Sequence, residues 1–222
     1  MTKQTLLLTL LSTTACAHAG QHGHHEQGHH HHRFTDPAAM AARWDDPSRD
    51  AWQKPESLVA ALEIAPGMTV SDIGTGTGYL LPHLVRAAGP SGVVIAQDIE
   101  PTMLDWVRQR ATREGWTNVT TAQGTSESPG LAPASVDRAV MINVWHHIEA
   151  RESFAAALGA TLRPGGRIVI VEARPGTGGE GPPEAMRLSP EQVIGSLQAA
   201  GLDARLLAWE NDRQYAVEAR LR

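Results

Sequence analysis

The segment MTVSDIGTGTGY, residues 68–79, constrains the fold more than any other part of the chain. Met68 to Ile73 is an apolar run of strand length, and Gly74, Gly76 and Gly78 follow it directly. Glycines let the main chain turn sharply and approach a ligand, and the free N–H groups at the start of a following helix face that ligand. The segment therefore predicts a strand, a ligand-binding loop and a helix.

Strand-like and helix-like stretches alternate along the rest of the chain. Strands are expected at 93–97, 119–122, 136–142 and 167–172, and helices at 38–44, 55–63, 79–88, 101–114, 149–162 and 191–200. The last two apolar stretches, 202–209 and 215–221, are typical of a β-hairpin. We expect an α/β fold of the Rossmann-like, doubly wound type, with three α/β/α layers and a mostly parallel seven-stranded sheet that ends in an antiparallel strand.

The charge balance argues against a nucleic-acid partner. The formal net charge is −5, with 24 acidic residues against 19 lysines and arginines, whereas nucleic-acid-binding domains carry a basic excess. A chain of 222 residues that is 41% hydrophobic has room for one folded domain, which we place at residues 37–222. We expect one site for a small-molecule substrate, and the sequence leaves the oligomeric state open.

Residues 1–19 resemble a secretory signal. Lys3 supplies a positive start, residues 6–11 a short apolar run, and residues 17–19 an A-x-A cleavage site. Cys16 offers an alternative, a lipid anchor, although Thr13 stands where lipoprotein signals usually have leucine. We expect export to the periplasm, or to the envelope as a lipoprotein, with no transmembrane span after processing because the apolar run is too short.

A histidine-rich leader, residues 20–36, follows the signal. Seven of the 11 histidines lie between residues 20 and 32, in a composition that offers nothing to build a core from and predicts disorder. Neutral imidazoles bind Zn²⁺, Ni²⁺ and Cu²⁺. The candidate metal ligands are His24, His25, His29, His30, His31 and His32. A solvated linker and an expression tag are the alternatives.

Two acidic residues accompany the glycine loop. Asp72 stands two residues before Gly74, where a carboxylate suits the ammonium group of an amino acid better than a pyrophosphate. The glycine spacing, G-x-G-x-G, also differs from the dinucleotide-binding pattern G-x-G-x-x-G. Asp98 ends the next strand, where a carboxylate can accept hydrogen bonds from both hydroxyls of a ribose. The alternative for Asp98 is a cap of the helix that begins at Pro101.

Four blocks in this order, DIGTGTGY, VVIAQDIEPTML, SVDRAVMINVWHHI and LRPGGRIVIVE, resemble the small-molecule branch of the class I S-adenosylmethionine-dependent methyltransferases. The resemblance covers roughly residues 58–221 and implies S-adenosylmethionine as cofactor. In that family the glycine loop binds the methionine portion, the acid after the second strand binds the ribose, and the loop after the third strand meets the adenine. The implied cofactor-binding residues are Asp72, Gly74, Thr75, Gly76, Gly78, Asp98, Ile99, Thr125, Ser126 and Asn143.

Thr125 departs from the family pattern. Relatives commonly have an aspartate at this position, which accepts from the adenine amino group. Because a threonine hydroxyl accepts more weakly than a carboxylate, we expect a modest affinity for the cofactor.

The block Asn143-Val144-Trp145-His146-His147 ends the fourth strand, which in this family points at the transferring methyl group. The cofactor supplies the electrophile, and the protein aligns the acceptor and excludes water. A base is needed only for an acceptor that carries a proton, and either histidine can serve. We name His146 as the candidate catalytic residue; the alternative is a structural pair that caps the strand end.

Two further segments border the predicted site. Trp52 and Gln53 are expected to form a lid over the cofactor or a wall of the substrate site; the alternative is that Trp44 and Trp52 seal the edge of the sheet. The glycine-rich segment 174–183 follows the fifth strand, where open α/β sheets place ligands. It is expected either to gate the site or to be an unconstrained surface loop.

The sequence favours an S-adenosylmethionine-dependent methyltransferase that acts on an unidentified small molecule. The alternative is an exported metal-binding protein whose histidine leader carries the function and whose methyltransferase-like domain does not turn over. Isoaspartyl-protein methyltransferases share the Gln-x-Pro run ahead of the glycine loop but not the NVWHHI block. Arsenite methyltransferases use several cysteines, and Cys16 is the single cysteine here.

Overall fold

The computed structural model describes Met1, residues 36–179 and residues 181–222. The expected signal beyond Met1, Cys16 and the candidate metal ligands of the histidine leader lie outside the described residues. The predictions of export, lipidation, leader disorder and metal binding therefore stay predictions. In the described part of the chain, no group of three or more His, Cys, Asp or Glu side chains is arranged to hold a metal ion. None of its helices is both long and apolar enough to cross a membrane.

A seven-stranded sheet forms the centre of the molecule, in the order β3-β2-β1-β4-β5-β7-β6. Its strands are β1 (Thr69–Ile73), β2 (Val93–Asp98), β3 (Val119–Gln123), β4 (Val136–Ile142), β5 (Leu162–Ala173), β6 (Leu202–Glu210) and β7 (Gln214–Leu221). β1 to β5 pair in parallel, and β7 lies antiparallel between β5 and β6. The predicted mostly parallel, doubly wound sheet with an antiparallel ending is confirmed.

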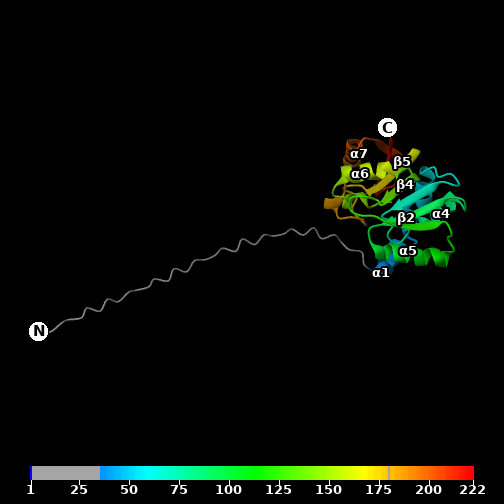
Figure 1. Cartoon of the computed structure of the whole chain (residues 1–222), viewed down its shortest axis with the longest axis horizontal. Coiled ribbons are helices and arrows are strands. Elements are labelled where there is room, and N and C mark those ends of the chain that lie inside the picture. Colours follow the sequence, from blue (N-terminus) through cyan, green and yellow to red (C-terminus); the bar gives the residue numbers. More distant parts are fainter. Residues whose placement is uncertain (2–35, 180) are drawn as a thin grey trace. The chain divides into compact units, whose positions relative to one another are not determined.

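Helices cover both faces of this sheet (Figure 1). They are α1 (Pro37–Trp44), α2 (Arg49–Gln53), α3 (Pro55–Ala61), α4 (Leu81–Ala88), α5 (Pro101–Glu114), α6 (Arg151–Ala160) and α7 (Pro190–Ala199), with short 3₁₀ turns η1 (Trp145–His147) and η2 (Glu184–Met186). The sequence did not predict α2, and it placed the start of β5 at 167 instead of Leu162. Pro164 and two glycines obscure the strand pattern there.

The alternation of side chains along β5 divides the core into two layers. Ile170 packs with residues of α6 and α7, whereas Val171 packs on the other face with residues of α3 and α4. Because successive strand residues point to opposite faces, Glu172 lies on the same face as Ile170, towards η1 and α6. This alternation decides which polar side chains meet at the carboxyl end of the sheet.

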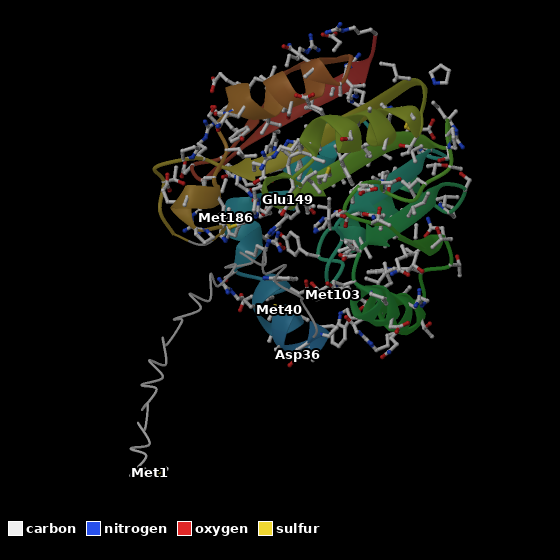
Figure 2. The ribbon with its side chains drawn as sticks, turned by 60° about the vertical axis from the view of Figure 1, so that its left-hand side comes forward. Met1, Asp36, Met40, Met103, Glu149 and Met186 are labelled. Carbon is white, nitrogen blue, oxygen red and sulfur yellow. The ribbon has the colours of Figure 1, made fainter. Side chains whose placement is uncertain are left out.

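The N-terminal helices lie beside the first half of the sheet. α1 contacts α5, and Figure 2 labels Met40 of α1 and Met103 at the start of α5. Asp36 caps α1 by accepting from the Ala39 N–H at 3.1 Å. The segment between α1 and α3 is therefore attached close to the glycine loop, at the carboxyl end of β1.

Candidate functional site

The glycine loop after β1 has main-chain angles that favour glycine. Gly74, Gly76 and Gly78 have φ angles of +68°, +54° and +84°, in the left-handed region where other residues are strained. A Cβ atom at Gly74 would lie 2.5 Å from the side chain of Val144. The Gly74 N–H donates to Gln97 Oε1 at 3.1 Å. The loop is therefore tightly packed at the end of the strands.

Asp72 lies beneath this loop, at the end of β1, and is only 4% exposed. Its Oδ2 accepts from Thr75 Oγ1 at 2.8 Å. Burial is the main cause that raises the pKa of Asp72 to about 7; the charge of Asp98 raises it further, whereas the Thr75 hydrogen bond and Arg49 lower it. A buried carboxylate with so little compensation favours an incoming cation. The buried Asp72 carboxylate therefore fits the ammonium group of an amino-acid ligand.

Asp98 ends β2, which lies next to β1 in the sheet, and is beside the glycine loop. Its Oδ2 accepts from the Gly76 N–H at 2.8 Å and its Oδ1 from the Glu100 N–H at 2.9 Å. Burial raises its pKa, although these main-chain hydrogen bonds act against the shift. The N-cap of α5 is Glu100, not Asp98, so the capping alternative is wrong. Asp98 is joined to the glycine loop, and its binding of a ribose stays a prediction.

The loop after β3 lies next to Asp98, since the Gly124 N–H donates to the Asp98 carbonyl at 3.0 Å. Thr125 Oγ1 accepts from two main-chain N–H groups, those of Glu127 at 3.2 Å and Ser128 at 3.1 Å. These bonds occupy both lone pairs of the hydroxyl, which leaves none to accept from a further donor. Thr125 therefore shapes the turn, which gives a structural reason for weak acceptance from an adenine amino group.

The remaining residues predicted near the adenine are exposed. Ser126 follows Thr125 in the same loop and is exposed. Ile99 is 48% exposed directly after Asp98. An exposed branched side chain beside Asp98 is suited to cover one face of a purine ring.

Asn143 follows β4 with a φ angle of +54°, a strained conformation for a residue with a side chain. Its Oδ1 accepts from Gln214 Nε2 at 3.2 Å, and Gln214 Oε1 accepts from Gln53 Nε2 at 2.6 Å. This chain of amides joins β4, β7 and α2. Gln53 is fully buried, so it anchors the segment above the site and does not form an exposed lid. The sequence missed Gln214, which no local pattern marks.

Residues 44–53, which we call the N-terminal cap, cover the glycine loop. A Cβ atom at Gly76 would lie 3.2 Å from the Trp44 ring. Thr77 Oγ1 donates to Asp45 Oδ1 at 2.7 Å, and the Arg49 guanidinium stacks 3.8 Å from the centre of the Tyr79 ring. Three residues of the cap therefore contact three residues in or next to the glycine loop. Trp44 is the aromatic residue among them, and it lies against Gly76.

A histidine and a glutamate meet on the other face of the sheet. His146 Nδ1 lies 2.8 Å from Glu172 Oε2, and the His146 main-chain N–H donates to Glu172 Oε1 at 3.2 Å. The side chains are 3% and 0% exposed. His147 is exposed, with its ring centre 4.1 Å from that of His146. The sequence named His146 but missed Glu172; the signal was its position at the end of β5, which matches that of Asp98 on β2.

The segment 174–183 is tied down in its described residues. The Arg187 guanidinium donates to the main-chain carbonyls of Pro182 at 3.0 Å, Arg174 at 3.1 Å and Gly178 at 3.1 Å. The expectation of an unconstrained surface loop is therefore wrong. The gating prediction stays a prediction, and Met186 in η2, labelled in Figure 2, lies directly before this arginine.

Comparison with known proteins finds a similarity that covers most of the site. A family model described as a methyltransferase domain matches residues 70–166, which include the glycine loop, Asp98, Thr125 and η1. A crystal structure of a SAM-dependent methyltransferase from Aquifex aeolicus superposes with a TM-score of 0.77 and 27% identity, over 83% of this chain and 97% of that one.

Curated relatives have several different activities in their names. The ubiquinone/menaquinone biosynthesis C-methyltransferase UbiE of Bordetella parapertussis is 33% identical over 109 residues, 49% of this chain and 42% of that protein. A protein-L-isoaspartate O-methyltransferase from Ignicoccus hospitalis is 32% identical over 120 residues, 54% of each chain. An arsenite methyltransferase from Halobacterium salinarum is 27% identical over 140 residues, 62% of this chain and 34% of that protein. The matches thus span about half or less of these relatives.

Proposed function

We propose that this chain, which belongs to the class I S-adenosylmethionine-dependent methyltransferases, transfers a methyl group from S-adenosylmethionine to a small-molecule acceptor. The observation that carries the proposal is the buried, weakly compensated carboxylate of Asp72 directly below the glycine loop. A group with these properties in a site is a candidate for ligand binding, because the ligand supplies the missing charge.

The residues of the carboxyl end fit the parts of this cofactor. Asp72 and the glycine loop would hold the methionine portion, and Asp98 the ribose hydroxyls. Ile99, Ser126 and Thr125 would border the adenine. Asn143 would border the site next to the glycine loop. When bound, the cofactor supplies an electrophilic methyl group on a sulfonium centre.

The protein contributes alignment and the exclusion of water. The N-terminal cap contacts Gly76, Thr77 and Tyr79, so it shields the methionine end of the site from solvent. The amide chain from Gln53 to Asn143 holds that cap against β4 and β7. Displacement at a sulfonium carbon depends on such alignment, since the barrier falls when the reactants are held in line.

The decisive experiment is calorimetry of the full chain with S-adenosylmethionine. Asp72→Asn removes the buried charge, and we expect it to weaken cofactor binding by about tenfold or more, the effect of losing a charged hydrogen bond. Asp105→Asn is the matched control, because Asp105 is exposed on α5 in a pair with Arg108. Absence of binding by the wild-type chain at millimolar cofactor, or equal binding by wild type and Asp72→Asn, would overturn the proposal.

We further propose that the protein acts outside the cytoplasm, in the periplasm or anchored to the envelope at Cys16. The signal-like residues 1–19 support this location. Fractionation of cells that produce the native chain tests it: recovery in the cytoplasmic fraction with Met1 still attached would refute export. Within the described residues, nothing favours the alternative of a metal-binding protein without turnover.

A further inference from the structure

Both carboxylate oxygens of Glu172 form hydrogen bonds with the same residue, His146. Oε1 accepts the His146 main-chain N–H at 3.2 Å, and Oε2 lies 2.8 Å from His146 Nδ1. The Glu172 side chain is 0% exposed. A buried carboxylate is costly unless it is fully hydrogen-bonded. A strand cap alone would require only the main-chain bond, so the ring contact needs a further explanation.

The second contact determines which ring nitrogen of His146 carries the proton. A carboxylate only accepts hydrogen bonds, so Nδ1 must be the protonated nitrogen of a neutral ring. Nε2 is then the nitrogen with a free lone pair. The ring hydrogen bond of His146 to Glu172 uses Nδ1, so Nε2 is the ring nitrogen left for a ligand.

The position of η1 brings this nitrogen to the site. Val144, two residues before His146, packs so closely against Gly74 that a Cβ there would overlap it at 2.5 Å. The turn that carries His146 therefore lies directly against the loop assigned to the methionine portion. A proton acceptor at this place is next to the acceptor substrate, not to the adenine or the ribose.

Charged and titratable neighbours of the pair come from three elements. Arg151 of α6 donates to the main-chain carbonyls of Trp145 and His146. The ring of His147 stacks on His146. Tyr215 of β7 has a pKa raised mainly by burial and also by the charge of Glu172, and its hydroxyl donates to the Leu188 carbonyl at 2.7 Å. Among these groups, Glu172 makes the hydrogen bond to the His146 ring.

We propose that Glu172 is a positioning residue that holds His146 in the Nδ1–H tautomer, so that Nε2 accepts a proton from an acceptor whose reacting atom is an O–H or an acidic C–H. This inference rests on the proposed function and names its substrate class. The X–H bond of the acceptor breaks, its proton passes to His146 Nε2, and the electron pair stays on X as the nucleophile. The resulting imidazolium faces the Glu172 carboxylate, which stabilises it.

The tautomer is measured directly by long-range ¹H–¹⁵N correlation NMR of the full chain, with His146→Gln used to assign the His146 signals. We expect the wild-type ring to carry its proton on Nδ1. In Glu172→Gln the single amide oxygen accepts the main-chain N–H, and the amide NH₂ then faces Nδ1, so the proton moves to Nε2. Glu149→Gln, at an exposed residue after η1 that Figure 2 labels, is the matched control and keeps the wild-type pattern.

Two NMR outcomes would overturn the positioning role: an Nε2–H tautomer in the wild-type chain, or an unchanged tautomer in Glu172→Gln. The wild-type spectrum decides the question even where Glu172→Gln fails to fold. Calorimetry with S-adenosylmethionine on the same samples separates this failure from failure of the proposed function, because cofactor binding remains intact when only the tautomer assignment is wrong.

The acceptor class is tested with three probes and methyl-labelled S-adenosylmethionine: catechol with an O–H, acetylacetone with an acidic C–H, and iodide with no proton to lose. We expect transfer to catechol or acetylacetone, and a fall in kcat of about a hundredfold in Glu172→Gln with little change in KM, as for loss of a general base. Transfer to iodide alone, transfer to none of the three, or equal kcat values would overturn the assignment.

Discussion

Glu218 on β7 and Asp72 on β1 are both buried acids of the same sheet, but their surroundings differ. Glu218 accepts from Arg167 at 3.2 Å, Arg205 at 2.6 Å and Arg220 at 3.3 Å. Burial acts to raise its pKa, yet the arginine hydrogen bonds outweigh it and the pKa is lowered. Asp72 accepts one hydroxyl hydrogen bond, and burial raises its pKa to about 7.

The two acids lie in one register row of the sheet but on different strands, since Asp72 pairs with Val140, Val140 with Val169, and Val169 with Glu218. Arg167 also donates to the Leu62 carbonyl at the end of α3, where Arg138 donates as well, so the arginine cluster joins a helix end to the amino-terminal half of the sheet. Asp72 and Asp98 instead accept from a hydroxyl and from main-chain N–H groups. The charge of Glu218 is compensated by arginines of the chain itself, as expected of a structural ion pair. The charge of Asp72 has no such compensation, as expected of a group that binds a charged ligand.

The largest expected effect is on stability, in Glu218→Gln. This change removes the buried charged partner of the Arg167 side chain, which is 4% exposed, and leaves it only the exposed Glu63; breaking a buried pair costs about 3–5 kcal/mol. Urea unfolding should show this loss with an unchanged slope. The affinity for S-adenosylmethionine should not change in the variant while it is folded.

The control for this change is Glu56→Gln. Glu56 pairs with Arg86 at 3.1 Å on the surface, where both side chains are mostly exposed. Such pairs contribute about 0–1 kcal/mol. Equal losses of unfolding free energy in the two variants would mean that the cluster around Glu218 adds nothing beyond a surface pair.

The second prediction concerns the pH dependence of stability. An acid whose folded pKa lies above its unfolded value of 3.8 destabilises the fold as pH rises from about 4 to about 7, since the folded state must give up its proton. We therefore expect Asp72→Asn to be more stable than wild type by about 2–4 kcal/mol at pH 8, with little difference at pH 4.

Because the other carboxylates titrate in both proteins, the quantity to measure is the difference in unfolding free energy between wild type and Asp72→Asn across pH. A difference that stays constant from pH 4 to pH 8 would contradict the raised pKa of Asp72. Saturating S-adenosylmethionine should reduce the advantage of the variant at high pH, because the cofactor ammonium compensates the charge in wild type alone.

The sequence predicted those elements and site residues that follow from the local hydrophobic pattern and from the positions of the strand ends. Asp72 and Asp98 were predicted together because the carboxyl ends of parallel strands meet at one edge of a sheet. The pairing of Glu172 with His146 and of Gln214 with Asn143 joins residues 26 and 71 positions apart, and depends on side-chain directions that only the folded sheet sets.

Thr125 illustrates a different limit. Its position was recognised from the family pattern, but its hydroxyl bonds to the main chain of its own turn, a competition with ligand binding that is common for threonine. The Arg187 bonds to the segment after β5 escaped prediction for a related reason, since a glycine-rich composition does not reveal a distant arginine that holds it.

The smallest expected effect sharpens the comparison at Asp72 itself. The Thr75 hydroxyl donates to Asp72 and thereby lowers the pKa of Asp72. Thr75→Val removes this hydroxyl and nearly keeps the side-chain volume. The pKa of Asp72 should then rise by about one unit, equivalent to about 1.4 kcal/mol. The pH range over which the fold loses stability then extends further upwards. The cofactor affinity at pH 7 falls several-fold, because a larger fraction of Asp72 is protonated. Thr77→Val is the matched control: it breaks a hydrogen bond in the same loop, to Asp45. An equal shift of the pH profile in both variants would show that loop packing, not the charge of Asp72, controls it.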